Sequence, residues 1–171
     1  MKGEPGIMIP PLEPPASHHV TAAEGWLELG NPAEAAAELA GVDSEWADHP
    51  AVIELEWQIQ AHASQWETCL TLAARLVARH PELPAGYIHR SYALHELQRT
   101  AEARDQLLPA LTLFPEEEIL PYNLACYECQ LVDLASAKKY LDKTFRPDKK
   151  YRIRALDDED LMPLWLVIDE D

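Results

Sequence analysis

The stretch PAGYIHRSYALHELQRTAEARDQLLPALTLFPEE, residues 84–117, decides the fold of this chain. Large residues stand at its fourth and eleventh positions, Tyr87 and Leu94, and small residues at its eighth and twentieth, Ser91 and Ala103. Apolar residues recur three and four positions apart, as one buried face of an amphipathic helix requires. Small side chains at fixed points let two helix backbones approach closely, and the large ones fill the gaps beside them. The stretch therefore predicts two antiparallel helices packed as a hairpin.

The same spacing returns when the chain is aligned on itself with a shift of 34 residues. A fixed period of this length is typical of stacked helical repeats. The repeats begin at Ala16, Pro50, Pro84 and Glu118, which gives frames 16–49, 50–83, 84–117 and 118–151. The small eighth and twentieth positions of the other frames hold Ala23, Ala35, Cys69, Ala125 and Ala137, and Trp57 is the departure.

The frame 84–117 continues with Leu107 at the twenty-fourth position, Ala110 at the twenty-seventh and Pro115 at the thirty-second. The full pattern of large, small, large, small, large, small and proline resembles the tetratricopeptide repeat (TPR). The resemblance implies an all-α fold, a right-handed superhelix of four helix hairpins over residues 16–151. We expect a C-terminal capping helix in residues 152–171, because the last repeat of such an array needs a cover. Leu156, Leu161, Leu164 and Trp165 are the expected covering residues, and the acidic run 157–160 is expected to be a solvated face. Residues 1–15 are proline-rich and predict an extended or disordered tail.

Charge excludes several classes of partner. The formal net charge is −16, and residues 1–74 hold twelve acidic residues against Lys2. Such a surface repels nucleic acid and anionic membranes, and it favours basic partners. No apolar stretch is long enough for a membrane span. Eight basic residues lie between Lys138 and Arg154. They are interpreted as local neutralisation at a helix end, as one half of a weak, salt-sensitive head-to-tail association, or as a second docking patch.

Motifs for chemistry are scarce. The sequence has no glycine-rich phosphate loop, no nucleophile elbow and no His-Glu-x-x-His pair, so we expect no enzyme activity, no cofactor and no metal. The three cysteines form no disulfide framework, which indicates reduced thiols and a cytoplasmic protein. One alternative remains open: Cys126 and Cys129, three residues apart on one helix face, with His95 nearby, make a metal- or redox-responsive protein conceivable.

The resemblance also implies where a ligand would bind. Family members contact peptides through inner positions of the first helix of each hairpin. Carried onto this chain, those positions include Glu24, Glu54, Gln58, His62, Ile88, Tyr92, His95, Tyr122, Cys126 and Gln130. Glu24 and Glu54 would repel a carboxylate ligand, so the sequence predicts a protein or peptide partner with apolar anchors and basic residues. The expected function is that of an adaptor, assembly factor or chaperone, with a self-associating scaffold as another alternative.

Overall fold

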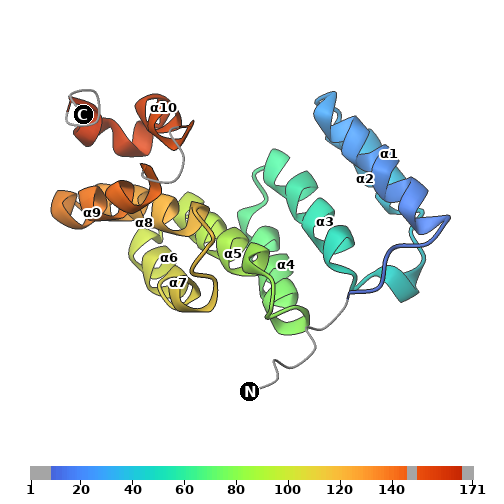
Figure 1. The fold of residues 1–171 in the computed structure, drawn as a ribbon. Coiled ribbons are helices and arrows are strands. Elements are labelled where there is room, and N and C mark those ends of the chain that lie inside the picture. Colours follow the sequence, from blue (N-terminus) through green and yellow to red (C-terminus); the bar gives the residue numbers. More distant parts are fainter. Residues whose placement is uncertain (1–8, 146–149, 167–171) are drawn as a thin grey trace, which may run out of the picture. The chain divides into compact units, whose positions relative to one another are not determined.

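A computed structural model describes residues 9–145 and 150–166 of the chain (Figure 1). Residues 1–8 of the proline-rich tail, Arg146 and Lys149 of the basic stretch, and residues 167–171 lie outside the described residues. The described part is helical and contains no strand. Its elements are α1 (Ala16–Glu28), α2 (Pro32–Leu39), η1 (Ser44–Trp46), α3 (Pro50–His62), α4 (Trp66–Arg79), α5 (Pro84–Glu96), α6 (Thr100–Leu107), α7 (Ala110–Leu113), α8 (Ile119–Gln130), α9 (Leu134–Phe145), α10 (Lys150–Asp157) and η2 (Glu159–Leu164), where η marks a 3₁₀ helix.

Local sequence sets where the helices begin. Pro32 and Pro50 occupy the first turns of α2 and α3, where a missing N–H costs no hydrogen bond. Asn31 caps α2, because its side chain accepts a hydrogen bond from the Glu34 amide at 3.3 Å. His49 caps α3, because its ring Nδ1 accepts a hydrogen bond from the Ala51 amide at 3.2 Å.

The turns inside the hairpins repeat with the period found in the sequence. Gly30, Ser64, Gln98 and Val132 all have positive φ, at 72°, 53°, 62° and 67°, and successive members are 34 residues apart. Each residue lies in the turn that leads from the first helix of a hairpin to the second. A left-handed residue at this point ends one helix and redirects the chain into the next.

The small residues expected at the crossing points are fully buried. α1 packs against α2, α3 against α4, and α8 against α9. At the eighth and twentieth positions of the four frames, the small residues have no exposed surface, namely Ala23, Ala35, Cys69, Ser91, Ala103, Ala125 and Ala137. The third hairpin differs in its second helix, which is interrupted at Pro109 and continues as α7.

Trp57, the large residue at a small position, contacts Cys69 through its main chain and His89 through its ring. Cys69 lies opposite it, and the thiol donates to the Trp57 carbonyl with Sγ and O 3.7 Å apart. The indole stacks on His89, with ring centroids 4.1 Å apart and planes 13° from parallel. A small residue on α4 and the flat ring of His89 on α5 therefore leave room for the large indole at this position.

The chain divides into two compact units, residues 1–89 and 90–171, with the boundary inside α5. In the first unit α3 packs against both α1 and α2 around Val20, Leu27, Val52, Leu55 and Ile59. In the second unit η2 packs against α8 and α9, and α10 packs against α9 and η2. None of the helices in residues 9–145 and 150–166 combines the length and apolar character needed to cross a bilayer.

The C-terminal segment covers α8 with two buried leucines, Leu161 and Leu164. Trp165 is half-buried, and its indole N–H lies 3.0 Å from the Ala155 carbonyl and 3.2 Å from that of Asp158. The expectation of a solvated acidic run is correct for Asp157 and Glu159, which are exposed, and wrong for Asp158 and Asp160. These two carboxylates bond to residues of α5 and α8, because alternate residues of the segment face the helices.

Candidate functional site

In the second unit, the side chains of α8 converge on Asp158. The Tyr122 hydroxyl donates to Asp158 Oδ2 at 2.7 Å, and the Cys126 thiol donates to the same oxygen across 3.7 Å. The other oxygen, Oδ1, accepts from the Asp160 amide at 3.1 Å and caps η2. Arg154 lies over the Tyr122 ring, 4.8 Å from its centroid, and adds positive charge beside the carboxylate.

Asp160 is held by the neighbouring positions of α5 and α8. His95 Nε2 lies 3.0 Å from Asp160 Oδ2, and the Gln130 amide donates to the Asp160 carbonyl at 2.9 Å. On its other side, the His95 ring lies 3.0 Å from the Thr100 hydroxyl through Nδ1. The hydrogen bond to Asp160 raises the pKa of His95, and burial opposes that shift. The ring therefore holds its proton more firmly than a free histidine.

The surroundings of Cys126 and Cys129 favour the protonated thiol. Burial, with help from Asp158 and Asp160, raises the pKa of Cys126 well above its usual range, and burial also raises that of Cys129. Ligand atoms of Cys126, Asp158 and Asp160 lie within 4.8 Å of one another. The Cys126 thiol and the Tyr122 hydroxyl bond to Asp158 Oδ2, and His95 Nε2 bonds to Asp160 Oδ2, so these contacts form a hydrogen-bond network.

In the first unit, three of the expected binding residues line one hollow. Glu24 of α1 and Glu54 and Gln58 of α3 surround a volume of about 260 Å³, together with His49, Leu55 and Leu83. Burial raises the pKa of Glu54, with His80 opposing the shift. Its carboxylate lies 4.0 Å from His89 Nε2. Because burial lowers the pKa of His89 to about 4, that ring is neutral at pH 7 and does not balance the charge of Glu54.

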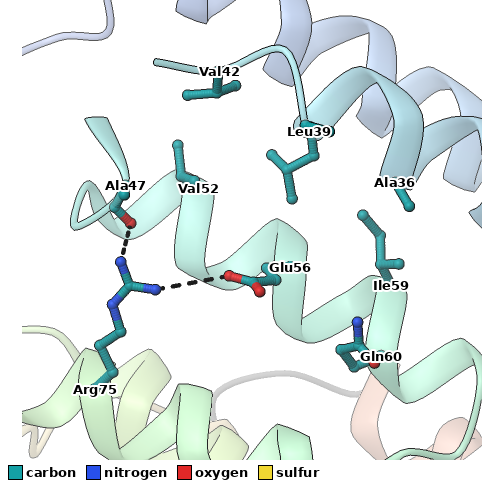
Figure 2. Close-up of a pocket in the computed structure, with 10 residues that line it drawn as sticks. Ala36, Leu39, Val42, Ala47, Val52, Glu56, Ile59, Gln60 and Arg75 are labelled. Atoms are coloured by element: carbon teal, nitrogen blue, oxygen red, sulfur yellow. Dashed lines mark hydrogen bonds and ion pairs between the residues drawn. The ribbon is translucent and has the colours of Figure 1, made fainter. Parts of the chain in front are cut away.

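A second hollow of the first unit, of about 310 Å³, lies between α2 and α3 (Figure 2). Leu39 and Val42 face Val52 and Ile59 across it, and Arg75 of α4 lies at one end. The Arg75 guanidinium donates to the Ala47 carbonyl and to Asp48, both at 2.8 Å, and Nη1 lies 3.8 Å from Glu56. This arginine therefore ties the loop before α3 to α4.

The structure places the expected binding residues in three environments. Glu24, Gln58 and His62 are exposed, and Glu54 and Ile88 are half-buried, all in the first unit. Tyr92 of the second unit keeps 41% of its surface exposed. Four others meet residues 158–160 of the same chain, namely His95, Tyr122, Cys126 and Gln130.

Sequence reasoning missed Arg75 and the contacts that Asp158 and Asp160 make with α8 and α5. For Arg75 a signal existed, since it is the first basic residue after Lys2 in an acidic half. For the two aspartates the run of four acidic residues gave no sign of which would face inward, because that depends on how η2 is seated by Leu161 and Leu164.

Comparison with solved structures decides the fold. One, titled "MamA RS-1 ArsTM double mutant", superposes with a TM-score of 0.66 at 15% identity and covers 80% of this chain and 77% of its own. MamA is a TPR-like protein. This chain has the TPR fold. A second MamA mutant gives a TM-score of 0.59 at 18% identity, with 76% of each chain covered. No protein-family model matches the chain, and no curated protein matches it in sequence. The TPR similarity is therefore one of fold.

Proposed function

We propose that this chain is a non-catalytic adaptor whose first unit binds a basic, partly apolar segment of another protein. The observation that carries the proposal is the hollow between α1 and α3, where Glu24, Glu54 and Gln58 come together. They come from two helices that are separate in sequence, and they occupy positions at which a TPR groove binds peptides.

The charge of this hollow favours a cation. Glu54 is a partly desolvated carboxylate, and its neighbour His89 is neutral at pH 7. A lysine or arginine head group entering the hollow would stabilise the charged form of Glu54 and of the exposed Glu24. The excess of acidic residues in residues 1–74 would also steer a basic segment toward the unit and raise its association rate.

The apolar part of the segment has a complementary surface beside the carboxylates. Leu55, Leu83 and Pro50 line the same hollow, and Leu83 is half-buried. A leucine or other aliphatic anchor next to the basic residue would bury its side chain there, and Gln58 supplies an amide for the peptide backbone.

The proposal is tested with short fluorescent peptides that combine leucines with lysines and arginines, against matched peptides carrying glutamates instead. We expect binding of the basic peptides, weakened by salt, and at least tenfold weaker binding by E24Q/E54Q, which corresponds to about 1.4 kcal/mol. Fluorescence anisotropy measures both. The control variant E13Q/E45Q removes two exposed carboxylates of the same unit and changes net charge equally.

Equal weakening in the two double variants would mean that only net charge matters, and the hollow would then not be the site. Binding of the acidic peptides as tightly as the basic ones would contradict the proposed partner chemistry as well.

A further inference from the structure

The face of α5 and α8 in the second unit presents hydrogen-bond donors to the C-terminal segment. The Tyr122 hydroxyl, the Cys126 thiol, His95 Nε2 and the Gln130 amide all point to oxygens of Asp158 or Asp160. A set of convergent donors is complementary to carboxylates, and Arg154 beside Tyr122 strengthens that preference. This chemistry is opposite to that of the acidic hollow in the first unit.

The segment that fills the face has a defined pattern. Asp158 and Asp160 supply the acceptors, and Leu161 and Leu164 are buried. Between the contacts, Glu159, Met162 and Pro163 are exposed. The pattern is therefore Asp-x-Asp-Leu-x-x-Leu, and Trp165 bonds back to Ala155 and Asp158 to fix its shape.

The contact differs from a simple apolar cover over the last hairpin. Its polar bonds use His95, Tyr122, Cys126 and Gln130, which are ligand-contact positions in the TPR pattern. Residues 158–164 thus sit where a bound peptide would sit, on α8 and on the part of α5 that belongs to this unit.

We propose that this face is a receptor for acidic segments, and that residues 158–164 occupy it as an intramolecular ligand which a partner segment of the same pattern displaces. The partner is a protein segment with carboxylates at its first and third positions and leucines at its fourth and seventh positions. The proposal is independent of the basic ligand assigned to the first unit.

The test uses the full-length chain and a fluorescent peptide with the sequence of residues 156–166. In D158N/D160N the internal ligand is weakened, so we expect the peptide to bind this variant at least tenfold more tightly than the wild type. The control D157N/E159Q changes two exposed carboxylates with the same change in net charge, and it should bind like the wild type. A peptide carrying Asn at positions 158 and 160 should bind none of them.

Equal peptide affinity for D158N/D160N and the wild type, or no binding to either, overturns the proposal. If the variant does not fold, the proposal is tested on the wild type instead. The rate at which a thiol reagent labels Cys126 is then measured by mass spectrometry. A displaceable segment predicts that Cys126 is labelled faster than buried Cys69, with a weaker dependence on denaturant than global unfolding, and that added peptide accelerates it. Labelling of Cys126 only with global unfolding overturns the proposal.

Discussion

At the scale of single residues, two histidines make the stability of the fold depend on pH in opposite directions. His89 in the first unit is half-buried and stacks on Trp57, and burial lowers its pKa to about 4. Its folded pKa lies below the unfolded value of about 6.5. Between these two pKa values the unfolded state therefore binds a proton more readily than the folded state. His95 in the second unit has a raised pKa because of Asp160.

Acid is therefore expected to destabilise the first unit through His89. Between pH 7 and pH 5 the free energy of unfolding should fall by about 2 kcal/mol more in the wild type than in H89F. Phenylalanine keeps a flat ring against Trp57 and cannot titrate. Denaturant unfolding followed by tryptophan fluorescence at several pH values measures the difference, and parallel pH profiles for the two proteins would refute the assignment.

The His95–Asp160 pair should behave in the opposite way. Its contribution to stability is fully present below the unfolded pKa of histidine and is lost as the pH rises through the raised folded pKa. The stability gap between the wild type and H95Q should thus be wider at pH 6 than at pH 9, by about 1 kcal/mol. Replacing Asp160 by Asn should remove this pH dependence, and a gap that does not change with pH would show that the bond is not charge-assisted.

At the scale of elements, the turn between α8 and α9 places a valine in the left-handed backbone conformation, to which valine is poorly suited. Val132, between α8 and α9, has φ of 67° and is 81% exposed. A β-branched residue is strained in the left-handed region, whereas glycine is not. Gly30 occupies the equivalent position between α1 and α2.

V132G is expected to raise the free energy of unfolding by about 0.5–1 kcal/mol, since relief of strain exceeds the added entropy of the unfolded chain. The matched control is L29G, at an exposed position with φ of −80°, which should lower stability by a similar amount. Thermal unfolding by circular dichroism compares the two, and destabilisation by V132G would contradict the argument.

The helices were predictable from the sequence because small and large residues recur with a fixed period and face a shared core. Ala23, Ala35 and Ala125 are buried, as that period requires. The seating of Asp158 and Asp160 was not predictable, because four consecutive acidic residues look alike in sequence. Only the tertiary contacts of Leu161 and Leu164 decide which of them face α8.

At the scale of the whole molecule, the two compact units carry different spectroscopic probes. Trp26, Trp46, Trp57 and Trp66 lie in residues 1–89, and Trp165 is the single tryptophan of residues 90–171. Five of the six tyrosines lie in the second unit. In a repeat architecture each part is stabilised mainly by its neighbours, so the units need not unfold together.

We expect tryptophan fluorescence and the labelling of Cys129 to give unfolding midpoints that differ, because four of the five tryptophans lie in the first unit and Cys129 lies in the second. At pH 5, H89F should shift the fluorescence midpoint and leave the Cys129 midpoint nearly unchanged. Coincident transitions that move together in H89F would show a single cooperative unit instead.

The residues with positive φ at positions 30, 64, 98 and 132 are glycine, serine, glutamine and valine. These residues range from no side chain through a polar hydroxyl and an amide to a β-branched apolar group, yet the main chain rotates in the same sense at each of them. The periodicity of this protein is thus stricter in its torsion angles than in its amino-acid identities. Two proteins of this architecture can therefore diverge almost completely at such a position while the path of the polypeptide stays the same.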